Sequence, residues 1–207
     1  MSNIVIHPTA LVSIPLRPLQ GMVTSTHNPT VKELKCDGDV FIGPYCIIGE
    51  GVHLGSNVII DSNSNIERGV RVGDNTLLVH RATIGGYSTV GSNCVVGGFI
   101  GENTKIGDNC RIFGTIAHKQ EDPSLSWDHR EFDEPSVTVH DWTFVSFHAF
   151  VAGGISLGPR AYVAAGAIVT KDVPPEHIAY GENSLCHYSE WPGQLSKSPF
   201  FRGDGMS

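Results

Sequence analysis

Residues 42–96 read, in groups of six, IGPYCI-IGEGVH-LGSNVI-IDSNSN-IERGVR-VGDNTL-LVHRAT-IGGYST-VGSNCV-V. Each group begins with Ile, Leu or Val, so ten aliphatic residues follow one another at intervals of six from Ile42 to Val96. A period of six matches neither the 3.6-residue period of a helix nor the two-residue alternation of an ordinary strand. It indicates instead a repeat architecture in which each unit is a short strand followed by a tight turn.

The positions within each group are typical of a coil that three such units close. The aliphatic first residue faces a narrow interior, where stacked coils bury a continuous column of apolar side chains. The fifth residue is small or β-branched, as in Cys46, Val52 and Ala82, which suits an inward position near a corner. Gly, Asn and Asp between them suit corners with unusual backbone angles. The pattern predicts parallel strands that stack about 4.8 Å apart.

The period slips once and is interrupted once. After Val96 the next aliphatic residue of the series is Ile100, four residues on, and the interval of six then resumes. Residues 118–138 break the repeat, which returns at Val139. The long break predicts a loop that leaves the body of the protein.

These boundaries predict one all-β domain. Counted from Cys36, twenty units form six or seven coils, a prism about 30 Å tall. We expect a lead-in over residues 1–35, the parallel β-helix over 36–175 with one long excursion loop at 118–138, and an irregular C-terminal tail over 176–207. The prolines and glycines of the tail oppose a long helix.

The composition excludes several classes of function. The 207 residues carry a formal net charge of −7 without a basic cluster, which argues against nucleic acid or an anionic membrane as the main partner. There is no apolar run of 18 residues and no signal-peptide pattern, so we expect a cytoplasmic protein with no membrane partner. The five cysteines include no Cys-x-x-Cys motif, and Cys46, Cys94 and Cys110 occupy the small inward position, which favours a structural role.

Residues 163–175, VAAGAIVTKDVPP, resemble the closing signature of the hexapeptide-repeat acyltransferases, and the repeat over about 36–175 is similar to theirs. The resemblance implies a left-handed parallel β-helix, a homotrimer with shared sites, and transfer of an acyl group, expected to be acetyl, from acyl-CoA. It further implies a small-molecule acceptor that offers a hydroxyl or an amine: a sugar, an amino sugar or a nucleotide sugar. Residues 181–186, GENSLC, depart from the Gly-Asn-Pro-Ala run of sugar and xenobiotic acetyltransferases, so the role of the tail stays open.

His118 is one candidate for the general base. In galactoside- and maltose-type acetyltransferases, which the chain resembles here, a His opens a loop of about this length. Long loops without secondary structure usually carry function, which independently favours the same place. A neutral imidazole is a suitable base at cytoplasmic pH and typically contributes about 10²- to 10⁴-fold to the rate. A backbone N–H on the neighbouring coil would stabilise the thioester oxyanion.

His80 is the rival candidate. Residues 79–85, VHRATIG, resemble the coil that bears the catalytic His in sugar-nucleotide and lipid A acyltransferases. His80 is the third residue of its unit, at a corner where a side chain can point outward. If His80 is the base, the expected acceptor is a nucleotide-linked amino sugar and the loop after His118 is a lid.

The residues expected to bind the coenzyme and the acceptor come mostly from the resemblance. Related enzymes hold pantetheine amides and adenosine phosphates at positions that correspond here to Ser146, Ala164, Thr170 and Lys171. Lys171, with Arg160, would offer positive charge to the phosphates. In the loop, an aromatic plane and polar groups for a sugar would come from three residues: Trp127, Asp128 and Arg130.

Two other classes remain to be weighed. A γ-type carbonic anhydrase uses the same prism with three histidines on zinc, but the sequence has no His-x₄-His pair, so we expect no metal. A non-catalytic scaffold built from the same repeat would need neither the loop that begins at His118 nor the Val-Thr-Lys-Asp signature at 169–172.

Overall fold

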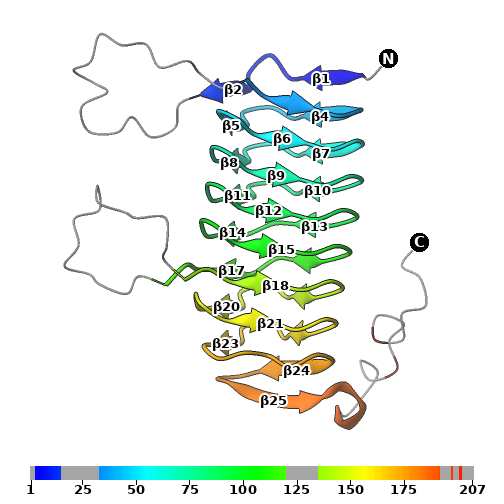
Figure 1. Ribbon diagram of the computed structural model, residues 1–207, viewed down its shortest axis with the longest axis vertical. Helices are drawn as coiled ribbons and strands as arrows, with labels where there is room; N and C mark the ends of the chain where they lie inside the picture. The colour runs from blue at the N-terminus through cyan, green and yellow to red at the C-terminus, as the bar shows by residue number, and fades with distance from the viewer. Residues whose placement is uncertain (1–2, 15–32, 120–134, 192–196, 198–200, 202–207) are drawn as a thin grey trace, which may run out of the picture.

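The computed structural model describes residues 3–14, 33–119, 135–191, 197 and 201 as three parallel sheets wound into one prism (Figure 1). The ten-stranded first sheet (sheet A) contains β1 (Ile4–Ile6), β4 (Val40–Ile42), β7 (Val58–Ile60), β10 (Leu77–Leu78), β13 (Val95–Val96), β16 (Arg111–Ile112), β19 (Phe144–Val145), β22 (Tyr162–Val163), β24 (His177–Tyr180) and β25 (Ser184–His187).

The eight-stranded second sheet (sheet B) contains β2 (Leu11–Ile14), β5 (Ile47–Gly49), β8 (Asn65–Ile66), β11 (Thr83–Ile84), β14 (Phe99–Ile100), β17 (Thr115–Ile116), β20 (Phe150–Val151) and β23 (Ile168–Val169). The seven-stranded third sheet (sheet C) contains β3 (Lys35–Cys36), β6 (His53–Leu54), β9 (Arg71–Val72), β12 (Thr89–Val90), β15 (Lys105–Ile106), β18 (Thr138–Val139) and β21 (Ser156–Leu157). Each coil passes through sheets A, B and C in turn, so the protein is a parallel β-helix, as the six-residue period predicts; it is left-handed, as the family resemblance implies.

The aliphatic first positions form the core, as the period predicts. Ile42, Ile60, Leu78 and Val96 stack in sheet A and are completely buried. Each buried aliphatic side chain of this size contributes about 1.5–3 kcal/mol relative to an exposed one. One repeating residue therefore supplies a continuous apolar column along the whole prism.

The fifth positions are also buried, and their polar members are satisfied by the coil beneath. Thr76 Oγ1 donates to the Gly91 carbonyl oxygen at 3.0 Å, and Ser88 Oγ donates to the Gly101 carbonyl oxygen at 2.9 Å. Cys46 is buried too, and this burial raises the pKa of its thiol. This buried environment agrees with the structural role that the sequence predicts for Cys46.

The corners use the left-handed backbone conformations that Asn tolerates best. Asn57, Asn75, Asn93 and Asn109 lie in one column between sheets C and A, with φ between 54° and 60°. Asn57 Nδ2 donates to Asn75 Oδ1 at 3.1 Å. Local side-chain chemistry therefore makes this corner regular from coil to coil.

The sequence interpretation of a single slip is wrong, because the structure contains two. Ile100 pairs with Ile116, and Ile116 follows Ile112 by four residues, as Ile100 follows Val96. Coils normally repeat after 18 residues, as from Ile66 to Ile84, but these two repeat after 16. Counted from Cys36, the repeat therefore has one unit more before the loop than the sequence interpretation gave, and this unit contains Ile116.

The sheets extend beyond the expected borders of 36–175. β1 and β2 lie in the lead-in and pair with β4 and β5. At the other end the tail begins with an ordered hairpin, in which β24 pairs with β22 in parallel and with β25 in antiparallel fashion. Phe201 then packs on Ile178 in this last coil. No helix in the described ranges is long and apolar enough to cross a membrane.

Candidate active site at a shortened corner

The corner between sheets A and B changes shape halfway along the prism. β10 reaches β11 through a turn that contains Val79, His80 and Arg81, whereas β13 reaches β14 through Gly97 and Gly98 alone. The Val79 N–H donates to Val96 O at 2.9 Å and the Thr83 N–H donates to Gly98 O at 2.9 Å. These flanking bonds keep the register, so the two omitted residues are those that would stack beneath His80 and Arg81.

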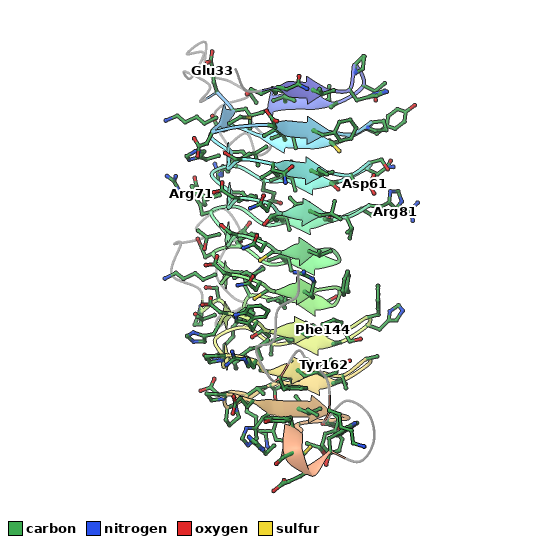
Figure 2. All side chains as sticks on the ribbon, turned by 90° about the vertical axis from the view of Figure 1, so that its right-hand side faces the viewer. Glu33, Asp61, Arg71, Arg81, Phe144 and Tyr162 are labelled. Atoms are coloured by element: carbon green, nitrogen blue, oxygen red, sulfur yellow. The ribbon has the colours of Figure 1, made fainter. Side chains whose placement is uncertain are left out.

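The next coil omits the same two residues. β16 reaches β17 through Phe113 and Gly114, and the Phe99 N–H donates to Gly114 O at 3.3 Å. We call these two turns, Gly97–Gly98 and Phe113–Gly114, the shortened corner. Figure 2 shows that they end closer to the prism than the turn bearing Arg81 above and the turn that follows Phe144 below. Because two consecutive turns are short, this edge of the prism extends less far outward in these two coils than in their neighbours.

Glycine is required at this corner for steric reasons. Gly98 has a φ of +71°, and a Cβ atom built there would collide with the carbonyl oxygen of Gly114. A Cβ atom at Gly97 would lie 2.5 Å from Val79 Cγ2. The close approach of the two backbones depends on the absence of a side chain at Gly98, whereas a side chain at Gly97 would meet the side chain of Val79.

His80 stands at the upper rim of the shortened corner and is exposed. Its Nδ1 lies 3.0 Å from Ser62 Oγ in the coil above, and the Ser62 N–H donates to Asp61 Oδ1 at 2.6 Å. When Nδ1–H donates to Ser62, Nε2 carries the free lone pair. Among the described residues Nε2 has no hydrogen-bond partner. The contact with Ser62 thus orients a ring that can accept a proton.

Backbone donors lie in the coil below His80. In the regular turn that contains His80, the fourth residue bonds within the turn, since the Ala82 N–H donates to Val79 O at 2.9 Å. Gly98 and Gly114 directly follow the first residue of their turns, so this bond cannot form, and their N–H groups have no acceptor within the described part of the chain. Gly98 is exposed and Gly114 is buried. An N–H group without a partner can bind an oxygen of a ligand.

An aromatic pair forms the lower side of the shortened corner. The rings of Phe113 and Phe147 stack with centroids 4.7 Å apart and planes 15° apart, and Phe147 remains 58% exposed. Ser146, one of the residues expected to bind the coenzyme, precedes Phe147 in the same turn. Ala164 occupies the corresponding place one coil further, where its N–H donates to Ala179 O at 2.8 Å. His80, Ser146 and Ala164 therefore lie along one corner of the prism.

His118 lies at the other end of sheet B. It follows β17 at the corner between sheets B and C and is half-buried. The Lys119 N–H donates to Pro135 O at 3.0 Å and closes the neck of the excursion. A Cβ atom at Gly153, in the coil below, would collide with the backbone of His118 and Lys119. Within one chain, His118 and His80 therefore belong to two different corners.

The remaining coenzyme candidates, Thr170 and Lys171, lie at the same corner as His118. Thr170 follows β23 at the B–C corner, and its N–H donates to Asn183 Oδ1 at 2.8 Å. Lys171 comes next and is exposed. Arg160, between sheets C and A, places Nη1 4.0 Å from Glu176 Oε1. The four predicted coenzyme residues are thus divided between the two corners of sheet B.

Several predictions lie outside the described residues. Trp127, Asp128 and Arg130 fall in 120–134. For metals, the described ranges contain no cluster of three or more His, Cys, Asp or Glu side chains that could hold an ion.

The outward faces of the three sheets differ in polarity. Sheet A exposes Phe41 and Ile59, and sheet B exposes Phe99, Phe150 and Ile168, each between 41% and 46% exposed. Sheet C presents polar residues in the same outward row: Lys35, His53, Arg71, Thr89, Lys105, Thr138 and Ser156. The outward rows of sheets A and B also contain polar residues, namely Arg111, Asn65, Thr83 and Thr115. The shortened corner lies where these two more apolar faces meet.

Comparison with known proteins identifies the repeat. Two family models match the sequence, the GMPPB C-terminal domain over residues 36–120 and the hexapeptide repeat of succinyl-transferase over 148–171. The six-residue repeat of this chain is thus similar to the hexapeptide repeat. Among curated relatives, the bifunctional protein GlmU of Lactococcus lactis subsp. cremoris (strain MG1363) is 25% identical over 182 residues, covering 85% of this chain and 32% of the relative. The chain thus spans about a third of the length of the curated relatives it matches.

Solved structures share the fold of this chain. The UDP-N-acetylglucosamine acyltransferase of Francisella novicida superposes with a TM-score of 0.52 at 22% identity, covering 88% of this chain and 70% of that one. The corresponding enzyme of Campylobacter jejuni gives a TM-score of 0.52 at 19% identity, covering 87% and 73%. At such identities the likeness establishes the β-helix.

Sequence reasoning missed Ser62, Gly98 and Gly114. The signal for the two glycines was present, since both four-residue intervals, Val96 to Ile100 and Ile112 to Ile116, contain one of them. Nothing in the sequence separates Ser62 from other corner serines, because its contact with His80 depends on the stacking of two coils.

Proposed function

We propose that this protein is an acyltransferase that moves an acyl group, of which acetyl is the expected case, from acyl-CoA to a hydroxyl or amine of a sugar-like acceptor. The observation that carries the proposal is that His80, oriented by Ser62, and the Gly98 N–H, which has no acceptor among the described residues, belong to adjacent coils of the same corner. A general base and an oxyanion donor are the two groups that attack on a thioester needs. The names of the similar structures, UDP-N-acetylglucosamine acyltransferases, support the same reaction class.

The proposed reaction needs no covalent enzyme intermediate. The acceptor oxygen or nitrogen attacks the thioester carbonyl carbon while His80 Nε2 takes its proton. The Gly98 N–H donates to the oxyanion of the tetrahedral intermediate. When the carbon–sulfur bond breaks, the imidazolium returns the proton to the departing thiolate. The products are the acylated acceptor and free CoA.

His80 is preferred over His118 because of what surrounds each residue. His80 lies above a turn that omits two residues and frees backbone donors, whereas the coil beneath His118 continues through Gly153 with its backbone tightly packed against it.

The polarity of the faces supports a homotrimer with shared sites. Three copies that pack face A of one prism against face B of the next would bury both apolar faces and leave the polar face C outside. The shortened corner would then lie beside the interface. In this arrangement Ser146, Ala164, Thr170 and Lys171 are the candidates for contacts with CoA.

The test is release of free CoA thiol from acetyl-CoA across a panel of sugars, amino sugars and nucleotide sugars. Wild type is measured beside His80→Ala and His118→Ala, with light scattering to establish the oligomeric state. Turnover that depends on His80 supports the proposal. Loss confined to His118→Ala moves the chemistry to the other corner. Neither turnover nor acetyl-CoA binding leaves the scaffold interpretation, and a monomer at working concentration contradicts shared sites.

A further inference from the structure

The last coil carries a hydroxyl, an imidazole and a carboxylate in series. β24 and β25 form this coil, at the end of the prism opposite β1 (Figure 1). β25 ends at His187 and is followed by a short 3₁₀ helix, η1 (Tyr188–Glu190). His187 Nδ1 lies 2.8 Å from Ser189 Oγ, and His187 Nε2 lies 3.7 Å from Glu176 Oε2. None of these three residues belongs to the shortened corner.

The backbone assigns the tautomer of His187. The Ser189 N–H donates to His187 Nδ1 at 3.4 Å, and a backbone N–H group can only donate. Nδ1 of the neutral ring therefore carries the lone pair, and the ring proton lies on Nε2, which faces Glu176. The Ser189 hydroxyl must then donate its own proton to Nδ1. The contact thus has the direction in which a base takes a proton from a serine.

The surroundings of His187 restrain its ring and prepare it for a positive charge. His177, its partner in the antiparallel pair, packs edge-on against it with ring centroids 5.6 Å apart. Glu176 is placed to stabilise the imidazolium that forms when the ring gains a proton. The other oxygen of Glu176 lies 4.0 Å from Arg160 Nη1, so a cation accompanies this carboxylate.

A second turn of the chain has the same local contact but lacks the carboxylate. His7 Nδ1 lies 2.9 Å from Thr9 Oγ1, and the Thr9 N–H donates to this nitrogen at 3.3 Å. Within the described part of the chain, His7 makes no ion pair. The local contact by itself therefore does not mark a functional serine or threonine. A nucleophile, a base and a third group that orients the base are together the signature of an activated hydroxyl, and only Ser189 has all three.

We propose that Ser189 is an activated nucleophile that accepts an acyl group from an ester, with His187 as the base and Glu176 as the residue that positions it. Ser189 Oγ attacks the carbonyl carbon of the ester while its proton passes to His187 Nδ1. The carbon–oxygen bond of the ester then breaks, and the departing alkoxide takes that proton. The products are acyl-Ser189 and a free alcohol. Water attacks acyl-Ser189 with His187 again as the base, so the full cycle hydrolyses the ester.

Exposure determines which esters suit this site. Ser189 is exposed, and the side chains of His187 and Glu176 are 37% and 42% exposed. So open a site gives little binding energy to a large substrate, and binding energy is what would offset a poor leaving group. We therefore expect esters with a small acyl group and a good leaving group, for which 4-nitrophenyl acetate is the probe.

The test follows release of 4-nitrophenol and, after an acid quench, the mass of the peptide that contains Ser189. In wild type this peptide should carry one acetyl group, and Ser189→Ala should lower the rate of release at least about tenfold. Glu176→Gln should lower kcat about tenfold without changing KM. Thr9→Ala is the matched control and should change neither readout. The mass of the peptide decides, because exposed imidazoles also hydrolyse this ester slowly without a serine.

Three results would overturn the inference: no acetyl group on Ser189 in wild type, equal acetylation of Thr9, or an unchanged kcat in Glu176→Gln. His80→Ala should leave acetylation of Ser189 unchanged, and its loss in that variant would contradict a separate site. None of these readouts requires transfer from acyl-CoA. The inference and the proposed function can therefore fail independently of each other.

Discussion

The two ends of sheet B were altered in opposite ways. At the A–B corner two successive turns lose two residues each, and at the B–C corner the chain gains the long excursion that begins at His118. The strands between them keep their register, since Thr83 pairs with Phe99 and Phe99 with Thr115. Changes in turn length are tolerated because each strand is held by its neighbours in the adjacent coils.

The chemical consequences of the two changes differ. An insertion can close its own neck, as the bond from the Lys119 N–H to Pro135 O does. A deletion can remove a bond within the turn: the fourth residue of a regular turn bonds back to the first, as the Ala82 N–H does to Val79 O, and the shortened turns leave no room for this bond. The N–H groups of Gly98 and Gly114 therefore have no acceptor among the described residues. We therefore expect the chemistry at the shortened corner.

The largest expected effect separates the two histidines. His80→Ala should lower kcat about 10²- to 10⁴-fold, because it removes the general base, whereas His118→Ala should lower it less than about tenfold. Steady-state release of CoA thiol checks both values at saturating acetyl-CoA. The opposite order would reverse the assignment of the corners.

Restoring the regular turn should be nearly as damaging. Inserting Ser-Asn between Gly97 and Gly98 recreates the six-residue interval and places residues beneath His80 and Arg81. We expect turnover to fall about 10²- to 10³-fold, as when an oxyanion donor is lost, while circular dichroism retains the β signal. The same dipeptide between His7 and Pro8, in the turn between β1 and β2 at the first coil of the same corner, is the control. Full activity of the first insertion would exclude the shortened corner as the active site.

Two glycines of the A–B corner allow a matched test of stability. Gly98→Ala should lower the free energy of unfolding by about 2–4 kcal/mol, because strain at its φ of +71° adds to the collision with Gly114. Gly166→Ala, with a φ of +69° and no atom within 4 Å of the added Cβ, should lose only about 1 kcal/mol. Urea unfolding measures both, and equal losses would show that the two coils are not tightly packed at the shortened corner.

The smallest expected effect concerns Ser62. Ser62→Ala removes one hydrogen bond to His80 Nδ1 and should lower kcat about three- to tenfold with little change in KM for acetyl-CoA. Ser62→Thr keeps the hydroxyl and should restore most of the rate. A Ser62→Ala enzyme with wild-type kcat would mean that the ring of His80 is oriented by other contacts.

The fold could be predicted further than the site. The residues that define the period, from Ile42 onward, are buried in the places that the period assigns them. The second slip was missed because Ile116 lies just before the excursion loop, so that Ile112 was taken as the last aliphatic residue of the repeat before this loop. Only the pairing of Ile100 with Ile116 fixes which residue belongs to which strand.

The sequence by itself determined the coil, its apolar column and the pair of candidate histidines, because a six-residue period leaves one way to bury every sixth side chain. Only the tertiary structure decided that Ser62 contacts His80 one coil above Gly98. These residues are 18 apart in sequence, and they become neighbours because one coil of 18 residues stacks on the next. It also decided that His118 belongs to the other corner, since two coils of 16 residues intervene. Side-chain chemistry fixes what each coil buries, whereas the stacking of coils fixes which exposed groups face one ligand.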